Sequence, residues 1–137
     1  MVSEAQIRGR IEKAVAKDLL RRGFKVQAKA RGFLGGGPGH PKRVDTGLLR
    51  TSIQVRLMTT GGGTKVRIGT NKRYATWVHD GTGIYGPKKV SIKPHRAKAL
   101  KFRAKSLGGG SKTVYAKSVK GMKKNEFLKD ALPAFKP

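Results

Sequence analysis

The sequence predicts an α+β protein with a long N-terminal helix, a mostly antiparallel sheet, a short mid-chain helix and a C-terminal helix. Three observations support this prediction. Apolar residues recur every three or four positions in the first 22 residues, and they alternate with basic residues in several later segments. Glycine-rich turns separate these segments, and a length of 137 residues predicts a single domain over 1–137.

The N-terminal helix is expected to run from Ser3 to about Arg22. Ser3 and Gln6 have the spacing of a capping box, in which each side chain bonds the other residue's backbone N–H. Gly23 follows directly and is suited to end the helix. One apolar stripe is expected along the helix, made of Ile7, Ile11, Ala14, Val15, Leu19 and Leu20.

Two glycine-rich segments, about 30–43 and 107–112, are expected to be mobile loops. The first combines a glycine triplet with two prolines, which disfavours a helix or a central strand. It also lacks the Gly-Lys-Ser/Thr ending of a phosphate-binding P-loop. A flexible basic loop is therefore a better interpretation than a nucleotide site.

The middle of the chain is expected to form strands with one apolar and one basic face. After a short helical turn capped by Asp45 or Thr46, alternation over 53–57 and 65–68 predicts a β-hairpin. Like charges on adjacent strands are unfavourable unless an anion or a partner covers them. Further strands are expected near 90–92, 100–104 and 113–119. The basic faces hold Arg56, Lys65, Arg67, Lys101, Arg103 and Lys105.

Two shorter helices complete the predicted fold. The first, over about 73–79, is expected to bury Tyr74, Trp77 and Val78, and the glycine loop from Gly81 to Pro87 follows it. The second, over about 125–132, is expected to end at a proline. Its buried stripe is predicted to contain Phe127, Leu128, Ala131 and Leu132.

Charge is the most informative property of the composition. The chain has 32 Lys and Arg residues against 7 Asp and Glu, a formal net charge of +25, and no acid lies between Asp80 and Glu126. A basic surface that serves only solubility is the plain alternative, but Lys and Arg in this excess favour a nucleic-acid neighbour. A membrane-binding arm is disfavoured because the charge is spread over strands.

Several classes of chemistry are not expected. The absence of cysteine excludes disulfides and thiolate zinc sites. His79 and Asp80 are adjacent, and neighbouring side chains diverge in helices and strands, so they are not expected to orient each other as a catalytic pair. His40 and His95 both lie beside prolines in basic surroundings. We therefore predict no catalytic residues, no metal and no cofactor.

Four segments in order give the chain a family resemblance: VDTGLLRTSI, VRIGTNKRYATWVHDGTGIYGP, KPHRAKALKF and VKGMKKNEFLKDAL. Over about residues 44–132 the chain resembles the neck or tail-completion proteins of long-tailed bacteriophages, also described as head–tail joining or minor tail components. The motif residues, which are candidates for subunit contacts, are Asp45, Thr46, Gly47, Leu48, Gly69, Thr70, Tyr74, Trp77, Gly81, Gly83, Phe127 and Leu128.

This resemblance implies a non-enzymatic virion protein that is assembled in the host cytoplasm. It implies a ring, expected to be a hexamer, between the head connector or stopper and the tail terminator or tail tube, with genomic DNA in its channel. The strand-borne bases would face that DNA or an acidic neighbouring protein. A stand-alone basic nucleic-acid-binding protein is the alternative, and a nuclease that depends on His79 or Asp80 is a third hypothesis.

Overall fold

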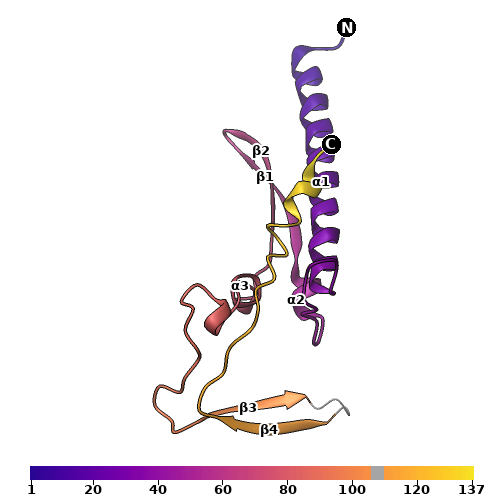
Figure 1. Ribbon diagram of the computed structural model, residues 1–137. Coiled ribbons are helices and arrows are strands. Elements are labelled where there is room, and N and C mark those ends of the chain that lie inside the picture. The colour runs from indigo at the N-terminus through magenta and orange to yellow at the C-terminus, as the bar shows by residue number, and fades with distance from the viewer. Residues whose placement is uncertain (106–109) are drawn as a thin grey trace. The chain divides into compact units, whose positions relative to one another are not determined.

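The computed structural model describes residues 1–105 and 110–137, and it does not describe the side chain of Lys105. The chain contains a long helix, short helices and two antiparallel two-stranded sheets (Figure 1), so the predicted α+β class is confirmed. Two compact units are present: residues 1–75 with 125–137, and residues 76–124. The single-domain organisation and the mobility of the two loops stay predictions, and residues 107–109 lie outside the described part. The expected start of the first loop near residue 30 is wrong, because residues 30–34 belong to the long helix.

Helix α1 (Glu4–Leu34) is longer than predicted. Its capping box is confirmed, because the Gln6 N–H donates to Ser3 Oγ and the Ser3 N–H donates to Gln6 Oε1. The expected end at Gly23 is wrong. A Cβ at Gly23 would lie only 2.7 Å from Val55 Cγ1, so this glycine lets the helix approach a strand closely. Packing of the following turns offsets the roughly 1 kcal/mol that a helical glycine costs.

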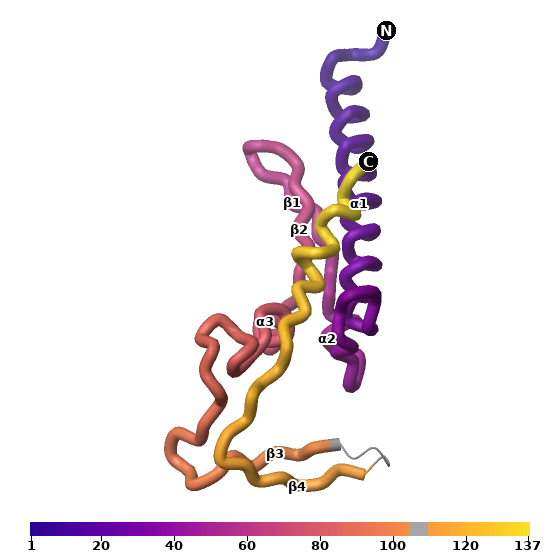
Figure 2. The backbone as a smooth tube through the Cα atoms, in the orientation of Figure 1, coloured from indigo at the N-terminus to yellow at the C-terminus, as the bar shows by residue number. Residues whose placement is uncertain are grey.

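Only the end of the predicted apolar stripe of α1 is covered, because Leu19 and Leu20 are half-buried while the earlier members are exposed. Ile7, Ile11 and Val15 are about half exposed or more. The side of α1 that packs against the rest of the first unit instead consists of Gly23, Val26, Ala30 and Leu34. In Figures 1 and 2 the first turns of α1 extend past the β1–β2 hairpin and past the C-terminal end of the chain.

Strands β1 (Gln54–Thr60) and β2 (Gly63–Gly69) form the predicted hairpin. Its apolar face packs on α1, and α1 also forms hydrogen bonds to the residue just before β1. Gln27 Nε2 and Arg31 Nη2 donate to the Ile53 carbonyl over 2.6 Å and 3.0 Å. Helix α2 (Leu48–Ser52) is the expected helical turn, but its N-cap is Gly47 with φ of 79°, so the expected cap at Asp45 or Thr46 is wrong.

The C-terminal segment of the first unit packs along α1 but is not the predicted α-helix. It forms turns and then a 3₁₀ helix, η2 (Leu132–Phe135). Short α-helices are marginal by themselves, and Pro133 lacks the N–H that an α-helix running through it would need, whereas it fits the first turn of η2. Phe127 and Ala131 are buried and Leu128 is half-buried, as the predicted stripe requires, whereas Leu132 is exposed.

The second unit holds most of the remaining elements. Helix α3 (Tyr74–Asp80) confirms the predicted mid-chain helix, and a 3₁₀ turn, η1 (Gly83–Tyr85), follows it. Strands β3 (Leu100–Lys105) and β4 (Ser111–Ala116) pair antiparallel. The strand expected near 90–92 is reduced to a single bridge between Ile92 and Val119.

Candidate functional site

The β1–β2 hairpin places three of the predicted bases on one exposed face. Arg56 lies directly opposite Arg67, and Lys65 lies opposite Met58. Arg56 Nη2 donates to Gln54 Oε1 over 3.0 Å, and among the described residues no ion pair joins these three bases to an acid. Directly opposed like charges are destabilising, so this face favours an anion that comes from outside the chain.

The β3–β4 hairpin repeats this arrangement in the second unit. Lys101 lies opposite Tyr115, with its Nζ 5.9 Å from the centre of the Tyr115 ring, and Arg103 lies opposite Thr113. The alternate positions, such as Phe102, form the apolar face. Lys105 is the third base predicted for this hairpin. Its backbone belongs to β3, but its side chain is not described.

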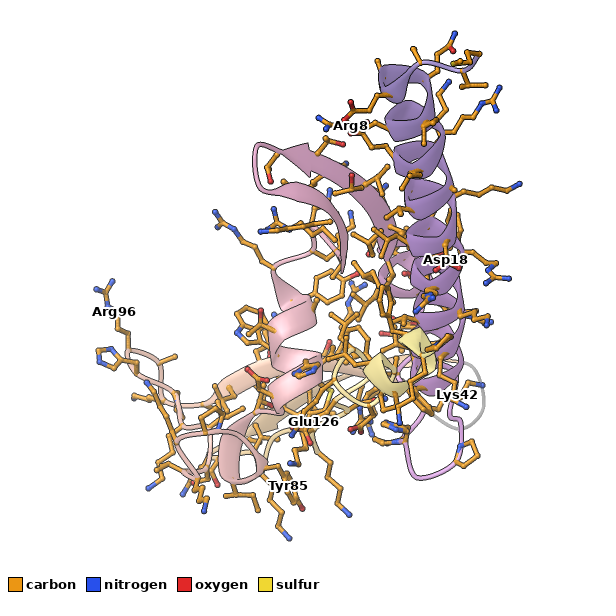
Figure 3. The ribbon with its side chains drawn as sticks, turned by 90° about the horizontal axis from the view of Figure 1, so that it is seen from above. Arg8, Asp18, Lys42, Tyr85, Arg96 and Glu126 are labelled. Atoms are coloured by element: carbon orange, nitrogen blue, oxygen red, sulfur yellow. The ribbon has the colours of Figure 1, made fainter. Side chains whose placement is uncertain are left out.

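The segment between η1 and β3 adds bases that the strand pattern did not single out. Its exposed Lys and Arg residues project from irregular backbone, and Figure 3 shows Arg96 pointing outward from this segment. The sequence showed that this region contains no acids, but no periodic pattern predicted which of its bases are exposed. The additional exposed bases are Lys88, Lys89, Lys93, Arg96 and Lys98.

The predicted motif residues around the first short helix do come together. Asp45, Thr46, Gly47, Leu48 and Tyr74 all line a shallow cavity of about 180 Å³. This volume is below the several hundred Å³ of a typical small-molecule pocket. The cavity therefore gives no support for a substrate site.

A second group of motif residues connects α2 to the end of β2. Ser52 Oγ and Thr70 Oγ1 are 2.5 Å apart, and Thr70 Oγ1 also accepts a hydrogen bond from the Lys72 N–H. Gly69 is the last residue of β2, and a Cβ there would meet nothing within 4 Å. Thr70 thus has a structural role within the first unit.

The glycines after α3 are required by contacts within the chain. Gly81 and Gly83 have φ of 80° and 64°, and a Cβ on either would collide with backbone of residues 120–124. Three hydrogen bonds join the two segments: Thr82 N–H to the Met122 carbonyl, Ile84 N–H to the Lys120 carbonyl, and Met122 N–H to Thr82 Oγ1. Contacts within the chain therefore account for both glycines, and a role of this loop in a subunit contact stays a prediction.

The burial predicted for the aromatic residues of α3 is wrong. Val78 is buried, but Trp77 is 62% exposed and Tyr74 is 38% exposed. Ala75 and Val78, three residues apart, are the buried pair of this short helix. The sequence shows which residues of the helix are apolar or aromatic, but it does not show which side of the helix the rest of the fold covers.

His79 and Asp80 contact each other, which corrects the expectation that their side chains diverge. His79 Nδ1 lies 2.8 Å from Asp80 Oδ1 at the end of α3. Adjacent side chains can meet here because the helix ends at Asp80. Among the described residues, no group of three or more His, Cys, Asp and Glu side chains could hold a metal ion.

One buried polar network was not predicted from the sequence. Asn125 is 1% exposed, and its Nδ2 donates to the carbonyls of Phe33 (3.2 Å) and Pro41 (3.0 Å). Its Oδ1 lies 2.8 Å from Nδ1 of His40, whose ring stacks on Phe33 and whose Nε2 is 3.5 Å from Asp130 Oδ2. The network fastens the loop after α1 to the C-terminal segment. Its members are far apart in sequence, so no local pattern could reveal it.

Comparison with known proteins identifies the family. A protein-family model, that of the bacteriophage HK97-gp10 tail component, matches residues 4–81, which is more than half of the chain. The chain belongs to the HK97-gp10-like family. This membership confirms the expected relationship to phage tail proteins and makes the chain a phage tail component. The comparisons with curated proteins and with solved structures gave no match.

The matched range covers the elements that hold most of the motif residues. It includes α1, both strands of the first hairpin and α3, and it ends at Gly81. The β3–β4 hairpin and the C-terminal segment lie beyond it. No helix in the described part of this HK97-gp10-like chain combines the length and the apolar character needed to cross a bilayer.

Proposed function

We propose that this HK97-gp10-like chain is a neck or tail-completion protein of the head–tail junction. Its copies close into a ring, which we expect to be a hexamer, between the head connector or stopper and the tail terminator or tail tube. Genomic DNA passes through the ring. The role is structural and uses no catalysis, metal or cofactor. Family membership over residues 4–81 is the observation that supports the proposal most directly.

The charge distribution supports a polyanionic neighbour. Five of the seven acids already contact side chains of their own chain: Glu4, Asp18, Asp80, Glu126 and Asp130. The opposed Arg56 and Arg67 are therefore not neutralised by these acids. In a closed ring each basic face repeats around the axis, so weak contacts to DNA phosphates would multiply. Such contacts are independent of base sequence.

Locating the chain in the virion tests the proposal. A phage that lacks the gene should accumulate filled heads and separate tails, and supplying the wild-type chain should restore joined particles. A density map of those particles should place the chain between connector and tail tube. Location at the distal tail tip, or absence from the particle, would reject the head–tail junction.

DNA binding tests the role of the basic face. The triple variant Arg56→Gln, Lys65→Gln, Arg67→Gln should weaken duplex binding and reduce the slope of log affinity against log salt by about 0.9 for each lost phosphate contact. The control variant removes the same charge from α1 by Arg10→Gln, Lys13→Gln and Lys17→Gln. Equal losses in both variants would indicate a non-specific charge effect. If wild type shows no salt-dependent DNA binding, the basic face binds an acidic protein partner instead. If the chain binds DNA tightly but is absent from virions, the stand-alone nucleic-acid-binding alternative is favoured.

A further inference from the structure

The β3–β4 hairpin of the second unit has no core of its own. Figure 1 shows its two strands lying side by side as a two-stranded ribbon. No described side chain in either strand is buried, and Phe102 and Tyr115 are 38% and 65% exposed. A two-stranded ribbon by itself is at best marginally stable in water. A ligand that covers this ribbon would therefore stabilise it.

The second unit also carries the denser positive charge. Residues 76–124 hold 13 bases and one acid, a net of +12 over 49 residues, whereas the other unit holds 19 bases and six acids, a net of +13 over 88 residues. The one acid of the second unit, Asp80, already contacts His79. So much like charge on a small unit repels itself unless an anion lies nearby. The ligand that this unit suits is therefore a polyanion.

One face of the ribbon combines cations with an aromatic ring. Lys101 and Arg103 lie on this face, with Tyr115 directly opposite Lys101 and Thr113 opposite Arg103. Lys101 Nζ is 5.9 Å from the centre of the Tyr115 ring. Cations bind the phosphates of a nucleic acid, and apolar groups contact the edges of its bases. An acidic protein would use only the cations, so the exposed ring favours a nucleic acid.

The shape of the ribbon indicates which nucleic acid. Neighbouring strands lie about 4.8 Å apart, and the major groove of B-form DNA, about 12 Å wide, admits a two-stranded ribbon. The major groove of an RNA duplex is too narrow for side chains to read. Among the described residues no further strand pairs with either edge of the ribbon, so both edges are open to the groove walls.

We infer that the β3–β4 ribbon is a DNA-binding arm that lies in the major groove of duplex DNA. Lys101 and Arg103 contact phosphates, and Tyr115 lies against the base edges. The inference rests on the proposed function for the presence of genomic DNA beside the chain. It goes further because it names the element, the form of the nucleic acid and a contact that is not electrostatic. The ribbon lies beyond residues 4–81, so the family match does not cover this contact.

Fluorescence anisotropy of the full chain tests this inference with duplex DNA and duplex RNA of the same length and sequence. Wild type should bind the DNA at least about tenfold more tightly, because only the DNA groove admits the ribbon. The variant Lys101→Gln, Arg103→Gln should bind the two duplexes within about twofold of each other. The control Lys13→Gln, Lys17→Gln removes the same charge from α1 and should keep the preference for DNA. Equal binding of both duplexes by wild type would overturn the inference.

Chemical protection of the groove gives a readout that requires no variant. Dimethyl sulfate methylates N7 of guanine, which lies in the major groove. Saturating wild-type chain should protect N7, and a duplex that stays fully reactive would overturn the inference. Tyr115→Ala should weaken DNA binding at least about threefold without changing its salt dependence, because no phosphate contact is lost. Tyr115→Phe keeps the ring and should bind like wild type.

The outcomes separate this inference from the proposed function. If the chain protects the major groove but is absent from the head–tail junction, the DNA-binding arm is confirmed and the proposed role fails. If the chain lies at the junction but leaves guanine N7 reactive, the role stands without the arm. Binding of an acidic virion protein by the ribbon, with no binding of DNA, would likewise reject the arm.

Discussion

Gly83→Ala should destabilise the second unit far more than the addition of one methyl group suggests. Gly83 has φ of 64°, a left-handed conformation that costs an alanine roughly 1–2 kcal/mol. Its new Cβ would overlap the Lys120 carbonyl oxygen and lie 2.7 Å from the carbonyl carbon. Backbone atoms cannot rotate away as a flexible side chain can, so the two segments must separate.

Separation weakens the three hydrogen bonds that join these segments, each of which contributes about 1 kcal/mol net. Those bonds are 2.8–2.9 Å long and involve Thr82, Ile84, Lys120 and Met122. Together with the backbone strain, the expected cost is about 3–5 kcal/mol. Native-state hydrogen exchange should show it directly as faster exchange of the Ile84 and Met122 amides.

Gly39→Ala is the control. Gly39 has φ of 76°, but a Cβ there would meet nothing within 4 Å, so only the backbone strain of roughly 1–2 kcal/mol is expected. Urea unfolding followed by circular dichroism measures both variants. Equal destabilisation by the two substitutions would refute the close approach of backbone at Gly83.

Three further changes test other parts of the structure. Asn125→Ala should cost about 3 kcal/mol in urea unfolding, because it removes three buried hydrogen bonds, and a loss below about 1 kcal/mol would contradict the network. Hydrogen bonds from Arg22 and then Arg21 lower the pKa of Asp18. Above about pH 4, wild type should therefore have a higher melting temperature than Asp18→Asn. The difference should vanish as pH falls through the lowered pKa. A difference that persists to about pH 2 would contradict the stabilising role of the ionised Asp18. Trp77→Ala should change the free energy of unfolding by less than about 1 kcal/mol, since the side chain is 62% exposed. A loss above about 2 kcal/mol would indicate that Trp77 is buried after all.

Local patterns predicted those elements that local interactions stabilise. The Ser3–Gln6 cap, the alternation of the first hairpin and the short helix at Tyr74 each depend on residues close together in the chain, and all three are present. The bases of the first hairpin also lie on one face, because strand alternation alone places Arg56 and Arg67 there. Their binding partner stays a prediction.

Sequence patterns gave wrong predictions where contacts with a segment distant in the sequence determined the local structure. Gly23 resembles a helix end in sequence, but Val55 packs against it and the helix continues to Leu34. The C-terminal segment has a helical pattern, but Asn125 holds its start against the loop after α1. The segment forms turns and then a 3₁₀ helix that begins at Leu132 and has Pro133 in its first turn. These differences depend on contacts between residues that are far apart in the sequence.

The sequence by itself determined the fold class, the excess of positive charge and the membership of a phage tail family, because composition, periodicity and ordered motifs are properties of the chain. Only the tertiary structure decided which apolar residues are buried. Val26 and Ala30 face the core, whereas Ile7 and Ile11 remain exposed on the same helix. Helical periodicity repeats along the whole of α1, but burial requires a surface to pack against, and the hairpin and C-terminal segment cover one side of its C-terminal half.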